Sequence, residues 1–296
     1  MTATYRNLAA IISTAELSAA LGEDNLRVFD CTTYLDPPTA DTKAPYTVRS
    51  GRADYDAGHI PGAGFVDLQG TLSDPDGPAH LRFTMPSPSD LAMRLKAIGV
   101  GDGTRVVLYS RGNMQWATRV WWMLYAIGFD DTAVLDGGWD KWIAEERAVD
   151  TQPVQYAAAL RLTVKPRPRA FAGRDEMLAA IDDNGSCTIN ALSADLHSGD
   201  NPRYGRPGRI PGSINVPAAA LQDPSDKRFP SPADALAHFE SAGLGKGKRA
   251  LVYCGGGIAA TLDAFLLLQL GYDDVAVYDA SMSEWAKDDS LPIEVG

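Results

Sequence analysis

Short apolar runs alternate with amphipathic stretches along the whole chain. The runs at residues 26–30, 105–109 and 249–253 have the length and composition of buried β-strands. The stretches at 14–21 and 89–98 are predicted to be helices. Because strands alternate with helices in each half, we expect an α/β fold in which each half forms a mainly parallel sheet covered by helices on both faces.

Polar stretches rich in turn-forming residues separate these elements. We expect a loop rich in Pro and Asp after Thr32, and a long loop from Asp67 to Pro88. Between them, a Gly-x-Ile-Pro-Gly turn at residues 58–62 brings the chain back under the predicted sheet.

The second half of the chain repeats the first. Residues 105–110 align with 249–254 at an offset of 144, and the same turn pattern returns at 208–212. Residues 128–131 align with 271–274 at an offset of 143, so the intervening loop is one residue shorter in the second copy. Ordered self-similarity over half a chain indicates a duplicated domain.

Chain length agrees with two domains. The 296 residues are enough for two domains of about 150 residues each. We predict an N-terminal domain at 1–150, a linker at 151–170 containing Pro153, Pro166 and Pro168, and a C-terminal domain at 171–296.

The composition is that of a soluble globular protein. Acidic residues outnumber basic ones by 38 to 27, which argues against a nucleic-acid-binding surface. No apolar run reaches the roughly 18 residues of a membrane span, and the run at residues 8–12 is too short for a secretory signal. We therefore expect a cytoplasmic protein. Its three cysteines include no Cys-x-x-Cys pair, so neither a disulfide framework nor a zinc site is indicated.

One of these cysteines stands where a nucleophile is expected. Cys254 directly follows the strand at 249–253, and three glycines and a helix start follow it. Such a loop can aim several backbone N–H groups at one point, which favours ionisation of a thiol and nucleophilic attack by it. An inert buried thiol is the alternative. Ser110 takes the equivalent place in the first copy, so the scaffold does not need a cysteine there, and we favour the nucleophile.

Several motifs together indicate a family. The Gly-x-Ile-Pro-Gly turn occurs twice, residues 136–142 read D-G-G-x-x-x-W, residues 279–285 read D-A-S-x-x-x-W, and only the second copy has a cysteine loop. In these features the chain resembles tandem-domain rhodanese-type sulfurtransferases over nearly its whole length. The likeness is greatest to the 3-mercaptopyruvate branch, whose loop begins Cys-Gly as Cys254-Gly255 does. It implies two rhodanese-like domains, of which the first is catalytically silent.

The resemblance also implies a reaction. Cys254 would take a sulfur atom from a small donor, hold it as a persulfide and pass it to an acceptor thiol or to cyanide. The acceptor would be a small thiol or a thioredoxin-like protein, and no metal, organic cofactor, nucleic acid or membrane is implied. Substrate binding would fall to Arg203 and to the loop N–H groups of Gly255, Gly256, Gly257, Ile258, Ala259 and Ala260.

Phosphatase chemistry is disfavoured. Phosphatases with a related loop close it with an arginine in a Cys-x5-Arg pattern, because phosphate needs a cationic clamp. Here that position is Ala260.

The chain departs from the family pattern at several substrate-binding positions. Gly256 and Ala259 stand where the mercaptopyruvate branch has Ser and Thr, and Leu192 replaces an arginine that would hold the donor's carboxylate. Arg203 matches a second such arginine and could still bind the carboxylate; a solvated loop arginine is the alternative.

Two further residues are implied in proton movement at the thiol. Asp67 matches a family aspartate that follows the first Gly-x-Ile-Pro-Gly turn, and His80 lies near the position of a family histidine; a surface histidine is the alternative reading of His80. Trp142 and Trp285 are predicted to anchor the cores, as large aromatic residues usually do.

Two functions remain open. The first is an active sulfurtransferase that uses 3-mercaptopyruvate, with thiosulfate as the alternative donor. The second is a weakly active or inactive carrier, sensor or binding module that keeps the fold, as the altered loop and the missing arginine suggest.

Overall fold

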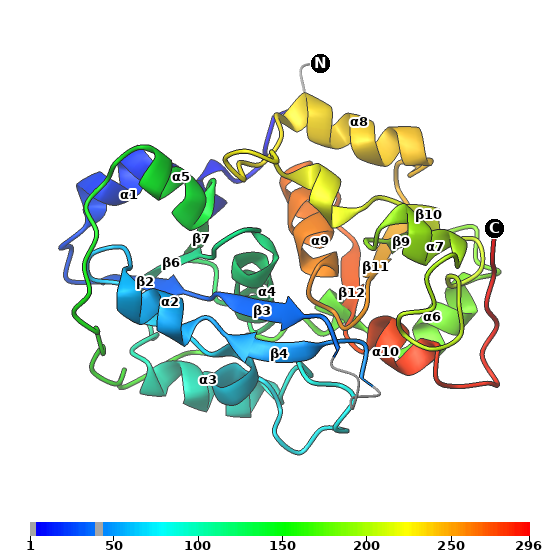
Figure 1. Ribbon diagram of the computed structural model, residues 1–296, viewed down its shortest axis with the longest axis horizontal. Helices are drawn as coiled ribbons and strands as arrows, with labels where there is room; N and C mark the ends of the chain where they lie inside the picture. The colour runs from blue at the N-terminus through cyan, green and yellow to red at the C-terminus, as the bar shows by residue number, and fades with distance from the viewer. Residues whose placement is uncertain (1–3, 39–43) are drawn as a thin grey trace.

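Two α/β domains lie side by side in the computed structural model, which describes residues 4–38 and 44–296 (Figure 1). The N-terminal sheet has five parallel strands, in the order β1 (Ile11–Ile12), β7 (Thr132–Leu135), β6 (Arg105–Tyr109), β2 (Leu26–Asp30) and β5 (Gly64–Phe65). The C-terminal sheet has the mirrored listing β10 (Ile214–Asn215), β9 (Ser186–Asn190), β11 (Arg249–Tyr253), β12 (Val275–Tyr278) and β8 (Phe171–Ala172). Read from the same edge, the two topologies are identical, which confirms the duplicated α/β fold.

Helices flank both sheets. The N-terminal domain contains α1 (Thr14–Ala20), α2 (Arg52–Ala57), α3 (Pro88–Ala97), α4 (Gln115–Ala126), α5 (Gly138–Ala144) and the short helices η1 (Leu8–Ala10) and η2 (Leu68–Leu72). The C-terminal part contains η3 (Pro168–Ala170), α6 (Arg174–Ala180), α7 (Ala194–Ser198), η4 (Ala218–Leu221), α8 (Pro232–Ala242), α9 (Ala260–Gln269) and α10 (Ser281–Trp285).

Capping residues fix several helix starts. Ser13 and Glu16 form a reciprocal capping box at α1. Ser87 and Ser231 cap α3 and α8, and in both helices a proline follows at the first position, where its missing N–H costs no hydrogen bond.

The core is shared between the domains. Strand residues alternate in facing: Val106 and Val252 belong to a cluster that runs through both domains, whereas Val107 and Leu251 face separate outer clusters. The outer clusters contain Trp142 and Trp285, both fully buried, as predicted. Because α4 and α9 fill the shared cluster between the sheets, each domain completes the other's core.

Two segments expected to be loops contain regular structure. Residues after Thr32 form an antiparallel hairpin of β3 (Thr33–Asp36) and β4 (Thr47–Ser50), and η2 is a π-helical turn. The Pro and Asp residues of the hairpin connection outweighed its β-branched and aromatic residues in the sequence pattern. A five-residue helix is too short to show a helical period.

The predicted linker packs along the N-terminal domain. Asp150 and Val154 form isolated β-bridges with His59 and Gly64, and the Tyr156 hydroxyl donates to the Gly62 carbonyl at 2.6 Å. The Trp122 indole then donates to the Ala170 carbonyl at 3.0 Å, just before the second domain begins.

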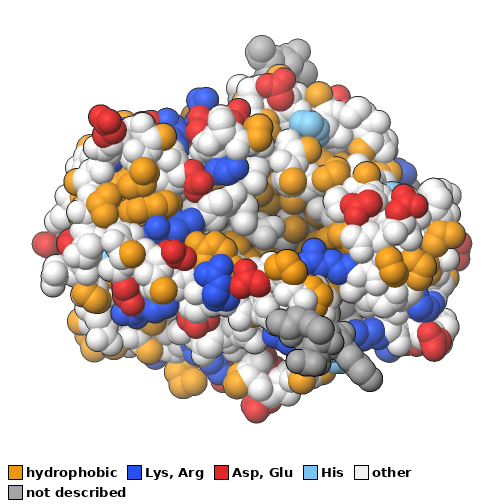
Figure 2. Space-filling view, viewed as in Figure 1, with side chains coloured by type: hydrophobic (Ala, Val, Ile, Leu, Met, Phe, Trp, Pro, Cys, Tyr) orange, Lys and Arg blue, Asp and Glu red, His pale blue; other side chains and the backbone are white. Residues whose placement is uncertain are grey.

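The surface carries mixed charge. On the face shown in Figure 2, Lys and Arg side chains are interspersed with Asp and Glu side chains over the described residues. Among these residues, none of the helices combines the length and apolar character needed to cross a membrane.

Candidate active site

Cys254 lies at the carboxyl end of β11, directly before α9 and beside α10. Its residue is 2% exposed, and its carbonyl accepts a hydrogen bond from Met282 N at 3.1 Å. The ends of parallel strands are where α/β proteins place reactive groups, so this position agrees with the predicted nucleophile.

Ser281 holds the cysteine loop closed. Its Oγ accepts hydrogen bonds from the backbone N–H groups of Cys254 at 3.0 Å and Gly257 at 3.2 Å, and donates to the Tyr278 carbonyl at 2.6 Å. Ser281 is fully buried and has φ +50°, a strained conformation for a residue with a side chain. Such strain persists only where surrounding contacts enforce it, and it clusters at functional sites.

A second clamp comes from Ser283 in α10. Its backbone N–H and its Oγ both donate to the Gly255 carbonyl, at 2.8 Å and 2.6 Å. The start of α10 therefore fixes the loop at three residues, Cys254, Gly255 and Gly257.

The remaining loop amides are open. Within the described part of the chain, the backbone N–H groups of Gly255, Gly256, Ile258 and Ala259 have no hydrogen-bond acceptor. Gly257 differs, because its N–H donates to Ser281. Unpaired amides at the start of a helix form a favourable environment for an anion.

An arginine from the N-terminal domain reaches the loop. Arg119 of α4 is fully buried and donates from Nη1 to the Gly257 carbonyl at 3.1 Å, while the same nitrogen lies 2.6 Å from Asp279 Oδ1. Its Nη2 donates to the Phe83 carbonyl at 2.6 Å, and Asp279 Oδ2 accepts from Met85 N at 2.7 Å. The ion pair thus connects the loop to the segment at 83–85 of the other domain.

Two tyrosines lie against the loop. The hydroxyl oxygen of Tyr204 is 2.0 Å from the position that a Cβ on Gly255 would take, and that of Tyr46 is 3.4 Å from a Cβ position on Gly256. Any side chain at residue 255 would therefore clash with Tyr204.

His80 and Arg203 lie at this site, on opposite sides of Tyr46. His80 lines a cavity of about 10 Å³ together with Tyr46, Arg82, Gly256 and Ser283. Its partial burial and the nearby Lys287 lower its pKa. Arg203 is exposed, donates from Nε to the Pro45 carbonyl at 3.2 Å, and holds its guanidinium carbon 5.9 Å from the centre of the Tyr46 ring.

Asp67 is placed differently. It caps η2, and its Oδ1 accepts from Gly70 N at 3.0 Å. Among the described residues, no hydrogen bond or ion pair joins its side chain to the cysteine loop.

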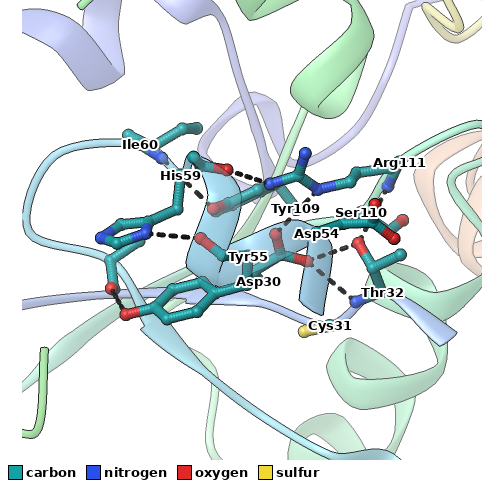
Figure 3. A network of polar contacts seen from close by, with 12 residues as sticks. Asp30, Cys31, Thr32, Asp54, Tyr55, His59, Ile60, Tyr109, Ser110 and Arg111 are labelled. Carbon is teal, nitrogen blue, oxygen red and sulfur yellow. Dashed lines mark hydrogen bonds and ion pairs between the residues drawn. The ribbon is translucent and has the colours of Figure 1, made fainter. Parts of the chain in front are cut away.

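The equivalent position in the first domain is closed by its own side chains (Figure 3). The Ser110 hydroxyl donates to the Asn113 carbonyl at 2.6 Å. Arg111, at the position of Gly255, ion-pairs with buried Asp30 at 3.2 Å and stacks its guanidinium 4.0 Å from the Trp139 ring centre. Burial raises the pKa of Asp30 despite that ion pair.

In the second domain the matching pair is absent. Asn190 takes the register position of Asp30, opposite Tyr253 rather than Tyr109, and contacts His197 at 3.2 Å. Burial and nearby Arg209 lower the pKa of His197 to about 4. Gly255 offers no charge to pair with, and Tyr204 fills the space above it.

Comparison with known proteins identifies the family. A model of the rhodanese-like domain matches residues 13–145 and 176–288. The chain belongs to the rhodanese family. It has the tandem-domain form of the sulfurtransferases, as the sequence motifs predicted.

Three similar proteins illustrate the range within this family. The 3-mercaptopyruvate sulfurtransferase of Escherichia coli K12 is 32% identical over 83% of this chain and 86% of its own length. The sulfur carrier protein TtuD of Thermus thermophilus is 32% identical over 82% of this chain and 87% of its own length. The crystal structure of the 3-mercaptopyruvate sulfurtransferase SseA of Escherichia coli superposes with a TM-score of 0.77 at 25% identity, covering 92% of this chain and 98% of that one.

Four residues at the site were not predicted from sequence: Tyr46, Arg119, Tyr204 and Ser281. Only Ser281 lies in a motif that the sequence displayed, the D-A-S of residues 279–281. The other three are distant from Cys254 along the chain and carry no local signal.

Proposed function

We propose that this rhodanese-family protein transfers sulfane sulfur from a small donor, 3-mercaptopyruvate in preference to thiosulfate, through a persulfide on Cys254 to an acceptor thiol or cyanide. The observation that carries the proposal is the loop itself. Cys254 precedes four backbone N–H groups that have no acceptor among the described residues, and the first domain has Ser110 and an ion pair at the same place.

The transfer takes place in two steps. The Cys254 thiolate attacks the donor sulfur, the carbon–sulfur bond breaks, and its electron pair leaves on carbon as the enolate of pyruvate, which takes up the proton of the donor thiol. The acceptor thiolate then attacks the outer sulfur of the persulfide and breaks the sulfur–sulfur bond. Cys254 returns as a thiolate, and the acceptor leaves as a persulfide, or as thiocyanate when cyanide is the acceptor.

The charges around the loop support the choice of donor. Arg203 carries no carboxylate partner among the described residues and lies beside Tyr46, where a donor carboxylate could accept from it. No basic residue follows Cys254 directly, which disfavours the thiosulfate dianion. The similarity to the mercaptopyruvate enzyme of Escherichia coli points in the same direction.

Mass spectrometry tests the proposal. Incubation with 3-mercaptopyruvate should add about 32 Da to the peptide containing Cys254, the mass of one sulfur atom. The Cys254→Ser protein should show no adduct and no turnover, whereas Cys187→Ser should behave like the unchanged protein. Absence of the adduct with both 3-mercaptopyruvate and thiosulfate would refute the proposal. The ratio of kcat/KM for the two donors identifies the preferred one.

A sulfur carrier is the second candidate, and one observation favours it. The Thermus thermophilus relative, as similar as the Escherichia coli enzyme, is named a sulfur carrier. A carrier would accept one sulfur on Cys254 and release it only to a protein partner. Repeated turnover with a small thiol acceptor would exclude this candidate.

A further inference from the structure

The cysteine loop supplies backbone groups but no polar side chain. Residues 255–260 are glycine, isoleucine and alanine, so no hydroxyl, amide or cationic side chain of the loop can donate a hydrogen bond to sulfur. Any side-chain donor to a sulfur anion on Cys254 must therefore come from another part of the fold.

Tyr204 reaches the loop from its own domain. It lies in the connection between α7 and β10, and its hydroxyl oxygen is the atom nearest to the Cβ position of Gly255. Glycine at residue 255 therefore leaves room for a phenol directly beside the nucleophile. In the first domain the same space is closed by the Arg111–Asp30 ion pair.

Tyr46 reaches the loop from the other domain. It immediately precedes β4, is buried, and brings its hydroxyl to Gly256 and Ser283. The Ser283 hydroxyl donates to the Gly255 carbonyl, so its hydrogen is not available to the cysteine. Tyr46 also lines the small cavity with Arg82 and has Arg203 above its ring, so the surroundings of its hydroxyl are cationic.

Both phenols remain protonated donors. Burial raises the pKa of Tyr46 and of Tyr204, and in both cases the nearby charge of Cys254 raises it further. A neutral phenol can donate a hydrogen bond to an anion without adding charge of its own.

We propose that Tyr46 and Tyr204 donate hydrogen bonds from the two domains to the sulfur anion on Cys254, first the thiolate and then the outer sulfur of the persulfide. This inference rests on the proposed function for the persulfide, but not for the thiolate. It makes the two domains joint contributors to one site, because neither tyrosine alone covers both Gly255 and Gly256.

Removal of the two hydroxyls tests the inference. Tyr46→Phe and Tyr204→Phe keep the rings, and a hydrogen bond to a charged group is strong enough that each loss should slow persulfide formation about tenfold. The pH midpoint of Cys254 alkylation by iodoacetamide should rise by about one pH unit in each variant and further in the double variant. Tyr125→Phe, whose half-buried ring stacks on Trp121, is the matched control and should change neither quantity.

The alkylation profile separates this inference from the proposed function. Iodoacetamide needs no sulfur donor, so the midpoint reports on the tyrosines even if no persulfide forms. An unchanged midpoint in the double Phe variant, with the thermal unfolding temperature preserved, overturns the role of the tyrosines. A shifted midpoint without any persulfide in the unchanged protein supports the tyrosines and refutes the sulfur transfer.

Discussion

The hydroxyl oxygens of Thr118 and Thr261 lie 3.0 Å apart. These threonines occupy equivalent positions in α4 and α9, 143 residues apart, so the two copies of the domain meet at the same residue of each. Trp121 contacts Phe265 edge-on nearby, with ring centres 4.8 Å apart. The two helices that follow Ser110 and Cys254 therefore pack on each other, and the interface reaches the cysteine loop through Thr261, which also donates to the Ile258 carbonyl at 2.7 Å.

The threonine pair should contribute to stability as a coupled unit. Thr118→Val and Thr261→Val should each lower the free energy of unfolding by about 1 kcal/mol, the net worth of a buried hydrogen bond. The double variant should lose less than the sum of the two, because the second substitution removes a hydroxyl that has already lost its partner. Urea denaturation of the four proteins measures this coupling. Strict additivity would show that the two hydroxyls do not interact.

Ser281 should matter more than its neighbour Ser283. Ser281→Ala leaves the buried N–H groups of Cys254 and Gly257 without their acceptor, and we expect a loss of about 2 kcal/mol in the free energy of unfolding. The loop should loosen as a result, and persulfide formation on Cys254 should slow in the protein that remains folded. Denaturation and single-turnover mass spectrometry measure the two effects.

Ser283→Ala is the matched control for that prediction. It removes one of two hydrogen bonds to the Gly255 carbonyl, and the backbone N–H of residue 283 still supplies the other. Its effects should be smaller in both measurements. If Ser281→Ala proved the milder change, the closing of the loop by Ser281 would be of no consequence.

The repeat made the fold predictable from the sequence. Buried parallel strands give continuous apolar runs, so β6 and β11 were found with their bounds. The hairpin of β3 and β4 was not found, because its residues are half-buried and its connection is rich in Pro and Asp. The length of chain between the predicted strands gave no indication that this hairpin brings Tyr46 to the second domain.

The site was predictable only where its residues adjoin along the chain. Cys254 and its glycines form one local motif, which a backbone-based argument can interpret. Arg119 and Tyr204 act through the packing of helices and loops, and an apolar helix such as α4 gives no sign that its one arginine is fully buried. His80 lies beside the loop as the resemblance implied, and its role at the thiol stays a prediction.

Arg119 should be the most sensitive residue of the domain interface. Arg119→Leu leaves Asp279 without its cationic partner and removes the donor to the Gly257 carbonyl. Breaking a buried ion pair costs about 3–5 kcal/mol, so the free energy of unfolding should fall by about that amount. Chemical denaturation measures the loss.

A double variant distinguishes the ion pair from the packing of the arginine stem. Arg119→Leu combined with Asp279→Asn removes both charges and should recover part of the lost stability, because no unpaired charge is left near the interface. Without any recovery, the loss would come from packing and from the carbonyl contacts alone. Arg161→Leu, which removes an exposed ion pair with Asp102, should change stability by less than about 1 kcal/mol.

Asp263 is a carboxyl group buried in the shared core. It lies on α9 and is fully buried, and neither of its side-chain oxygens has a hydrogen-bond partner among the described residues. Burial raises its pKa well above the usual range, so the folded protein holds this proton at a pH where the unfolded chain has released it.

Stability should therefore decline as the pH rises above the ordinary range for aspartate. The unfolded chain releases the Asp263 proton near pH 4 and the folded chain only at higher pH, so this group's contribution is fully present below that point and is lost up to the folded pKa. Asp263→Asn cannot ionise and should gain stability relative to the unchanged protein between pH 5 and pH 8, as the free energy of unfolding at several pH values in that interval would show. Asp131→Asn, at an exposed position, is the control and should run parallel to the unchanged protein. Parallel curves for Asp263→Asn as well would mean that the carboxyl is ionised in the fold, and that the core holds a charge at this position.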